Sequence, residues 1–220
     1  MTFRIDRRAL IATAGFGLGG LMLPGGRLAA QTLLGLTGFT HNVASGEPGS
    51  DSMLLWTRYV SATGSPSKVR AEVSESRDFA KIVSGGQMVT GPWRDHTVKV
   101  TVDGLQPGRT YFYRFIAPDG TISPIGRTKT LPVGKTSKFN IAIFSCSNLG
   151  FGEFNAYGHA AARDDIDLVL HMGDYIYEYG RGGYDGGAKF AARIFPAGEI
   201  FTLADYRLRY ASYRSDPQLQ

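Results

Sequence analysis

The stretch DLVLHMGDYIYE, residues 167–178, carries the clearest fold signal in this 220-residue chain. Its first part, Asp167–His171, is a short apolar run of the kind found in strands that are buried on both faces of a parallel sheet. A similar run lies upstream at Asn140–Phe144, and the apolar spacing between the two runs indicates a helix over Glu153–Arg163. A strand, a helix and a strand in this order predict a β-α-β unit of about 30 residues with parallel strands.

This arrangement brings chemically active side chains to one edge of the predicted sheet. Cys146, the only cysteine, follows the first strand, and Asp174 follows the second after a glycine that permits a sharp turn. Because parallel strands end side by side, we expect both residues to meet in one crevice. Tyr177 adds a phenolate suited to a ferric ion. These residue types suggest a metal site, but composition and spacing alone favour a buried, inert cysteine.

Residues 38–132 follow a different pattern, in which short β-rich runs are separated by turns. Three valines at 98, 100 and 102 alternate with polar residues, and Asp119-Gly120 marks a hairpin turn. The pattern predicts an all-β sandwich of about 90 residues, of the immunoglobulin or fibronectin-III type. The candidate strands are Ser52–Tyr59, Lys68–Ser74, Gln87–Thr90, Thr97–Val102, Thr110–Ile116 and Thr121–Thr128.

Two aromatic residues in this region receive structural interpretations. A Leu-x-Pro-Gly turn delivers Tyr111 to the start of a strand, as in the tyrosine corner of fibronectin-III-like domains. We therefore expect Tyr111 to clamp the corner rather than to bind a ligand. Trp56 is expected in the core.

Residues 1–30 have the pattern of an export signal. The pair Arg7-Arg8 precedes the apolar, glycine-rich segment Ala9–Leu23, and small residues ending at Ala30 offer a cleavage site. The arginine pair resembles a twin-arginine signal, so we expect the twin-arginine export machinery as a partner and a periplasmic or secreted location. The apolar run is shorter than the ~20 residues needed to span a bilayer, which favours cleavage over a permanent membrane anchor.

The charge and composition narrow the function classes. The chain holds 24 Lys and Arg against 19 Asp and Glu, for a net charge of +5, and residues 1–30 contribute four arginines and one aspartate to it. No basic stripe forms elsewhere, so we expect no nucleic-acid partner. Hydrophobic residues make up 43% of the chain, which argues against wholesale disorder. One cysteine also excludes an internal disulfide.

Several motifs together resemble the alkaline phosphatase D family, the PhoD-like metallophosphoesterases. FTHNVASGEP and LWTR resemble the opening of that family's sandwich domain, and FSCS and HMGDYIYEYG resemble its two metal motifs. TLADYR and YRSDPQLQ resemble the helix that comes next. The six stretches occupy residues 39–48, 55–58, 144–147, 171–180, 202–207 and 213–220.

The resemblance implies a secreted enzyme that hydrolyses small phosphate mono- or diesters with ferric iron and calcium, through a metal-activated oxygen nucleophile. By motif position, Cys146 and Tyr177 would ligate the iron, and Asp174 would bridge iron to calcium. It also implies that residues 138–220 are the first part of an α/β metallophosphoesterase domain, a truncated αββα sandwich. The family's later Asp-Asp-His-Glu motif does not occur before Gln220, so we expect the chain alone to be inactive and assign no catalytic side chain.

Two other functions stay open. One is a phospholipase-D-like phosphodiesterase of the same family, and the other is a secreted binding module built on the sandwich. No serine has a base assigned by a motif, so a serine nucleophile is the weaker interpretation. Stoichiometric iron would favour the enzyme over the binding module.

The segments around the metal motifs receive further interpretations. Gly180–Gly187 is either a mobile lid or a flexible surface loop, and Asp185 within it is a weak calcium candidate. The pattern of Thr202–Arg214 predicts a helix that begins with a capping box. We expect the arginines of this helix to be solvated or structural. His171 either packs within its strand, which is the favoured interpretation, or supports the metal ligands from behind.

Overall fold

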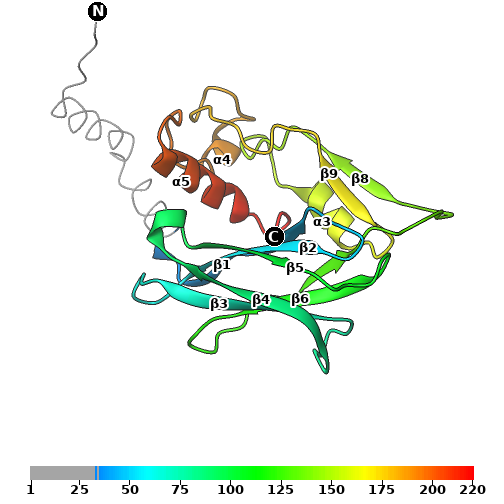
Figure 1. Ribbon diagram of the computed structural model, residues 1–220. Coiled ribbons are helices and arrows are strands. Elements are labelled where there is room, and N and C mark those ends of the chain that lie inside the picture. Colours follow the sequence, from blue (N-terminus) through cyan, green and yellow to red (C-terminus); the bar gives the residue numbers. More distant parts are fainter. Residues whose placement is uncertain (1–32, 34) are drawn as a thin grey trace, which may run out of the picture. The chain divides into compact units, whose positions relative to one another are not determined.

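The computed structural model describes residues 33 and 35–220, shown in colour in Figure 1. The predicted export signal at residues 1–30 lies outside the described residues. The chain divides into two compact units. The β unit comprises residues 36–143, 159–170 and 220, and the loop unit comprises residues 144–158 and 171–219 with the described residues 33 and 35.

The β unit contains two antiparallel sheets. The first has the strand order β1-β2-β5 and the second has the order β4-β3-β6-β7. A single 3-10 turn, η2 at Pro92–Arg94, precedes β5. The strands are β1 Gly38–Gly46, β2 Met53–Val60, β3 Ser67–Ser74, β4 Ile82–Thr90, β5 Thr97–Val102, β6 Thr110–Ile116 and β7 Gly126–Lys129.

One apolar core draws on strands of both sheets. Val98, Val100 and Val102 of β5 are buried, as the alternating pattern predicts. They pack in one cluster with Leu55 of β2 and Phe115 of β6, both of which are fully buried. The cluster therefore joins the two sheets through the inward-facing residues of each strand.

The aromatic predictions have different outcomes. Tyr111 is 1% exposed, and its hydroxyl accepts a hydrogen bond from the Gln106 N–H at 2.8 Å, so the predicted corner clamp is confirmed. The prediction that Trp56 lies in the core is wrong. Leu55 and Thr57 point into the core, and the alternation of β2 therefore directs Trp56 to the other face, where it is half-buried.

The strand β1 was not among the predicted strands. The register of β1 against β2 shifts between Phe39 and Val43, and Asn42 adopts a positive φ of 58° within it. This irregularity breaks the two-residue alternation on which the prediction of strands depends. β4 also begins earlier than predicted, at Ile82, because two glycines interrupt its apolar pattern.

The predicted strand, helix and strand are confirmed as β8 Ile141–Phe144, α3 Asn155–Ala161 and β9 Leu168–His171. The carbonyl of Asn140 accepts from the Asp167 N–H at 2.9 Å, and the carbonyl of Phe144 accepts from the Met172 N–H at 2.8 Å. Paired residue numbers rise together along the chain, so the two strands are parallel.

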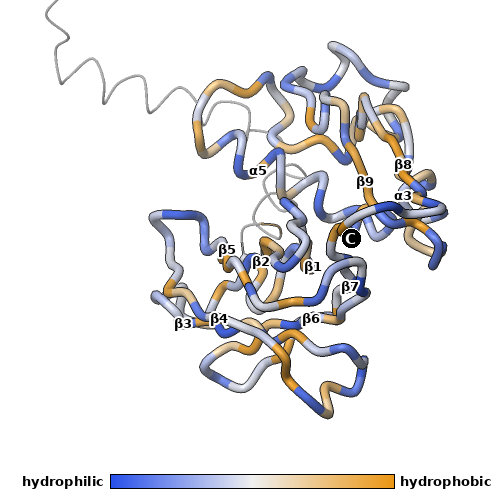
Figure 2. Tube along the Cα trace, turned by 45° about the vertical axis from the view of Figure 1, so that its right-hand side comes forward, coloured by the Kyte–Doolittle hydropathy of each residue, from blue (hydrophilic) through white to orange (hydrophobic). Residues whose placement is uncertain are grey.

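The expectation that these two strands are buried on both faces is wrong. Ile143 is 63% exposed and Val169 is 54% exposed, and Figure 2 shows both strands as strongly apolar segments. Within the described residues this sheet has only two strands, so its apolar side chains have few neighbours.

The loop unit contains α4 Ala188–Ala191 and α5 Leu203–Arg214. The predicted capping box of α5 is confirmed. The Thr202 hydroxyl accepts from the Asp205 N–H at 3.2 Å, and the Asp205 carboxylate accepts from the Thr202 N–H at 2.9 Å. No helix within the described residues has the length and apolarity to span a membrane.

Candidate metal centre

The candidate metal ligands lie where β8 and β9 end. Cys146 and Asp174 adopt positive φ angles of 56° and 52°. Gly173, which directly precedes Asp174, has a φ of 119°. The Cys146 N–H donates to the Gly173 carbonyl at 3.2 Å, and the Ser147 N–H donates to the Asp174 carbonyl at 2.8 Å. Non-glycine residues with positive φ are uncommon and concentrate at functional sites. The backbone thus holds the two ends together and turns both side chains out of the strands.

Three side chains converge at this edge. The Cys146 thiol lies 3.8 Å from Oδ2 of Asp174, and the Tyr177 hydroxyl donates to the same oxygen at 3.0 Å. Cys146 and Asp174 are exposed, and Tyr177 is half-buried. We call these three residues the ligand cluster. The structure brings together all three residues that the sequence motifs single out.

The donor types of the ligand cluster fit a ferric ion. Desolvation, followed by the hydrogen bonds to Cys146 and Asp174, raises the pKa of the Tyr177 hydroxyl above its ordinary value. A tyrosine in this setting keeps its proton and donates it to the carboxylate. A cation among the three groups would reverse this preference, because positive charge stabilises thiolate, carboxylate and phenolate together.

The ligand cluster supplies less of a calcium site. Calcium takes roughly six to eight oxygen ligands, and Asp174 is the only carboxylate of the cluster. Among the described residues, no group of three or more His, Cys, Asp or Glu side chains gathers in a metal-binding arrangement. The cluster therefore depends on Tyr177 as its third member.

A closed set of hydrogen bonds lies behind the ligand cluster. Nε2 of His171 lies 2.8 Å from the Ser147 hydroxyl and 2.9 Å from the Tyr157 hydroxyl, and the two hydroxyls also contact each other. The Gly173 N–H donates to Nδ1 of His171 at 3.3 Å, so a neutral ring carries its proton on Nε2. His171 thus joins the residue after Cys146 to the residue before Asp174, a role beyond the strand packing that its pattern favours.

Two sequence positions could have indicated this network. Ser147 directly follows the cysteine, and His171 lies three residues before Asp174. Adjacency to both candidate ligands was therefore visible in the sequence. Tyr157 was not identifiable in this way, because its apolar helix spacing is equally typical of packing.

The glycine-rich loop at 180–187 has its own hydrogen bonds. The Asp185 carboxylate accepts from the N–H groups of Gly182 at 2.6 Å and Gly187 at 3.1 Å. The Gly186 N–H donates to the Gly150 carbonyl at 2.8 Å. Asp185 therefore braces its own loop, and neither of its bonds involves the ligand cluster.

Aromatic rings border the ligand cluster on the side of this loop. The ring centroids of Tyr177 and Tyr184 are 5.8 Å apart, and those of Tyr179 and Tyr184 are 5.4 Å apart. Phe151 extends the group at 5.0 Å from Tyr184. Tyr179, Tyr184 and Phe151 are each about half exposed, so Tyr177 is shielded on one side by rings that also face solvent.

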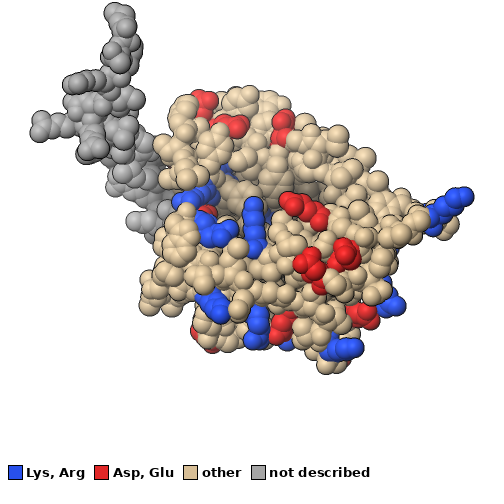
Figure 3. Space-filling view, viewed as in Figure 1, with Lys and Arg blue, Asp and Glu red and all other residues tan. Residues whose placement is uncertain are grey.

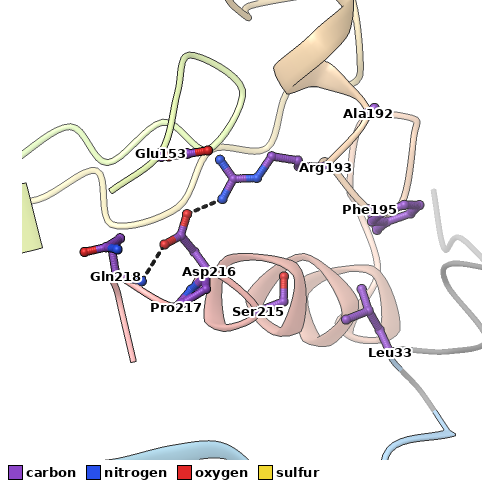
Figure 4. A pocket seen from close by; sticks show the side chains of 9 residues that line it. All are labelled: Leu33, Glu153, Ala192, Arg193, Phe195, Ser215, Asp216, Pro217 and Gln218. Atoms are coloured by element: carbon purple, nitrogen blue, oxygen red, sulfur yellow. Dashed lines mark hydrogen bonds and ion pairs between the residues drawn. The ribbon is translucent and has the colours of Figure 1, made fainter. Parts of the chain in front are cut away.

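A cavity of about 690 Å³ lies elsewhere in the loop unit, near the end of α5 (Figure 4). Figure 4 shows the Arg193 guanidinium paired with the Asp216 carboxylate at its wall. No member of the ligand cluster lines this cavity. On the face shown in Figure 3, both basic and acidic side chains are exposed, and neither sign covers the whole face.

Comparisons with known proteins place this chain in a family. Residues 27–132 match the family model of the PhoD-like phosphatase N-terminal domain, and residues 141–220 match that of the PhoD-like phosphatase. The two matched ranges leave only a short gap between them and together cover most of the chain. The chain therefore belongs to the PhoD-like phosphatase family.

Individual relatives agree with this assignment. Alkaline phosphatase D of Bacillus subtilis (strain 168) is 42% identical over 191 residues, which are 83% of this chain and 32% of that protein. A solved structure titled "Structure of PhoD" matches with a TM-score of 0.75 and 41% identity, over 83% of this chain and 36% of the other. The chain thus spans about a third of the length of these relatives.

Proposed function

We propose that this chain forms part of a secreted, metal-dependent phosphoesterase that hydrolyses small phosphate esters. The observation that carries the proposal is the convergence of Cys146, Asp174 and Tyr177 at the ends of two parallel strands. Family membership supplies the reaction class, since the matched models and the Bacillus relative are described as phosphatases. The ligand types supply the metal.

In this proposal Cys146 and Tyr177 would hold ferric iron, and Asp174 would contribute its carboxylate to both cations. When bound, the cations would supply positive charge that offsets the charge of the phosphate group and stabilises the departing oxygen. Tyr177 must release the proton that its hydroxyl donates to Asp174. Iron binding should therefore weaken as the pH falls.

The attacking oxygen in this proposal comes from water rather than from a side chain. Ser147 has a histidine partner at 2.8 Å, a distance at which a histidine base can activate a serine. However, Nδ1 of His171 accepts from the Gly173 N–H, so Nε2 of the neutral ring carries the proton and cannot accept that of the hydroxyl. Ser147 is also only 5% exposed, and its hydroxyl is engaged by Tyr157. These contacts support a structural role for Ser147 and leave it poorly accessible to a phosphate ester.

We do not expect these 220 residues alone to hydrolyse phosphate esters. The ligand cluster offers one thiolate, one carboxylate and one phenolate, whereas calcium alone takes roughly six to eight oxygen ligands. We therefore propose that the chain binds iron by itself and that hydrolysis needs additional ligands. No feature of the ligand cluster distinguishes monoesters from diesters, so a phospholipase-D-like preference for diesters would rest on other residues.

Two further parts of the proposal concern fold and location. The sheet orders β1-β2-β5 and β4-β3-β6-β7, together with the Tyr111 corner, support a fibronectin-III-like sandwich in the β unit. The twin-arginine pattern of residues 1–30 supports export of the folded protein to the periplasm or beyond.

The test is iron binding by the purified chain and by matched variants. We expect about one ferric ion per chain by elemental analysis, with a visible phenolate-to-iron absorption band. Cys146→Ala should abolish stoichiometric iron, and Tyr177→Phe should remove the band. Ser145→Ala is the control, because Ser145 is exposed and adjacent to Cys146 but outside the ligand cluster.

Two results would contradict the proposal. One is a wild-type chain that binds no iron when folded, as judged by circular dichroism. The other is a Cys146→Ala, Tyr177→Phe double variant that binds iron as well as the wild type does. Hydrolysis of 4-nitrophenyl phosphate and bis(4-nitrophenyl) phosphate by the 220-residue chain would overturn the statement that more ligands are needed.

A further inference from the structure

Arg209 of α5 is a buried cation that binds only backbone carbonyls within the described residues. Its side chain is 1% exposed. All five of its N–H groups donate, at 3.0 to 3.1 Å for four of the bonds and with one still shorter contact. The accepting carbonyls belong to Tyr177, Tyr179, Phe195, Pro196 and Gly198.

Burying the Arg209 guanidinium costs free energy, and its hydrogen bonds fix the geometry of two loops. Burying a guanidinium without a bonded carboxylate carries a desolvation cost, and burial correspondingly lowers the pKa of Arg209. An apolar residue of similar size would avoid that cost but would leave the five carbonyls without these donors. The distinctive result of the arginine is that two loops, residues 177–179 and 195–198, are held against one planar group.

Tyr213, one helical turn after Arg209, holds the other backbone group of Tyr177. Its hydroxyl accepts from the Tyr177 N–H at 3.1 Å and from the Leu149 N–H at 3.4 Å. Leu149 lies three residues after Cys146. The carbonyl and the N–H of Tyr177 are therefore both bound to α5, and the same hydroxyl reaches the loop that follows Cys146.

We propose that Arg209 and Tyr213 are positioning residues that fix the Tyr177 phenol beside Asp174, so that α5 sets how tightly the ligand cluster holds a ferric ion. The inference rests on the proposed metal site. A ligand on a loose loop must be ordered when the ion binds, and the entropy of that ordering lowers the affinity. With both backbone groups of Tyr177 bound, most of that ordering is complete before the ion arrives.

The experiment compares two variants of the same helix. Tyr213→Phe removes only the hydroxyl and preserves the ring. Ser212→Ala is the matched control, because Ser212 is 1% exposed and its hydroxyl donates to the Arg193 carbonyl, away from the ligand cluster. Arg209→Lys and Arg209→Met test the guanidinium. Each variant is titrated with ferric ion against a competing chelator, and its thermal unfolding is measured in parallel.

We expect Tyr213→Phe and Arg209→Lys to lower the ferric affinity by about tenfold or more, the range found for residues that orient metal ligands. The phenolate-to-iron band should shift or weaken in both variants. Ser212→Ala should keep the affinity within about twofold of the wild type, even if its unfolding temperature falls as far as that of Tyr213→Phe. Equal losses in Ser212→Ala and Tyr213→Phe would show that α5 contributes stability alone, and would overturn the proposal.

A measurement without metal separates this inference from the proposed function. Hydrogen exchange of the Tyr177 amide should accelerate at least several-fold in Tyr213→Phe and stay unchanged in Ser212→Ala. Unchanged exchange in Tyr213→Phe would overturn the positioning role, whatever the iron titration shows. If exchange accelerates in Tyr213→Phe but the wild-type chain binds no ferric ion, the backbone contacts are established. The proposed metal site and the effect of α5 on affinity are then overturned.

Discussion

Different interactions stabilise the interior of the β unit and the interior of the loop unit. In the β unit, fourteen buried residues form one apolar cluster between the sheets. In the loop unit the corresponding cluster has three buried residues, Leu149, Phe154 and Tyr213. The first unit therefore relies on a large shared core, whereas the second must obtain its order from other contacts.

Those other contacts are buried polar side chains with specific partners. Arg209, Ser212 and Asp216 are each at most 2% exposed, and each is hydrogen-bonded to another segment of the loop unit or to its own turn. A buried polar group that is left without its partner carries the full cost of its desolvation and has no substitute nearby. The geometry of the candidate metal centre therefore depends on single side chains.

The largest expected effect is on the core of the β unit. Phe115 is fully buried in β6, and Phe115→Ala should lower the free energy of unfolding by about 4 kcal/mol through lost burial and a residual cavity. Both tryptophans, Trp56 and Trp93, lie in the β unit, so tryptophan fluorescence in a urea titration reports on this unit. A loss below about 1 kcal/mol would contradict the shared-core description.

The next largest effect is on the loop unit. Asp216 is 2% exposed and accepts from the Arg193 guanidinium and from the Gln218 N–H at 2.8 Å (Figure 4). Asp216→Ala leaves Arg193 without its carboxylate and should cost about 3 kcal/mol. Hydrogen exchange should show faster exchange of α5 amides, while the amides of β5 keep their protection.

The control for this variant is an exposed ion pair of the β unit. Arg70 is 58% exposed at the side chain and bonds Glu72 at 2.9 Å. Arg70→Ala should change stability by less than about 0.5 kcal/mol. Equal acceleration of the α5 and β5 amides in Asp216→Ala would mean that the two units unfold together, which contradicts the comparison.

The predictability of the two units differs for the same physical reason. The β unit repeats a two-residue alternation, and turns such as Asp119-Gly120 are marked by residues that tolerate positive φ; Gly120 has a φ of 83°. These local signals identify most of its strands and the Tyr111 corner. They fail at Asn42, where an irregular register removes the alternation.

In the loop unit, topology predicts more than local pattern does. The approach of Cys146 to Asp174 follows from two parallel strands joined by a helix, which the apolar runs indicate. The role of Arg209 could not be predicted in this way, because its partners are backbone carbonyls, which every residue has. An arginine that binds such groups has the same sequence pattern as a solvated one.

A smaller effect is expected at the tyrosine corner of the β unit. Tyr111→Phe removes the hydrogen bond from the Gln106 N–H but keeps the buried ring. The free energy of unfolding should fall by about 1 to 1.5 kcal/mol, the usual contribution of one buried hydrogen bond. Urea titration followed by tryptophan fluorescence measures it. A neutral Tyr111→Phe, with the circular dichroism spectrum unchanged, would mean that packing of the ring alone holds the corner.

The smallest expected effect depends on pH and concerns Asp167 in the β unit. Its carboxylate accepts from the Lys129 ammonium and from the Asn140 N–H at 2.7 Å. These bonds, with that of Lys129 first, hold the pKa of Asp167 below its ordinary value. Because the folded pKa is below the unfolded one, the stabilisation is complete above the unfolded value, near pH 4, and is lost as the pH falls through the folded pKa.

Asp167→Asn should therefore lower the free energy of unfolding by about 1 kcal/mol at pH 7 and by progressively less below about pH 4. Urea titrations at about pH 7 and about pH 3 measure the difference. Asp164→Asn is the matched control, because Asp164 also pairs with a cation, Arg127, but is 97% exposed at the side chain. Asp167 is 12% exposed. A charge in that position is screened less by water than the charge of Asp164, so only Asp167→Asn should show the pH-dependent difference. The same loss at pH 3 and pH 7 would show that the carboxylate stabilises the fold by its shape and neutral hydrogen bonds rather than by its charge.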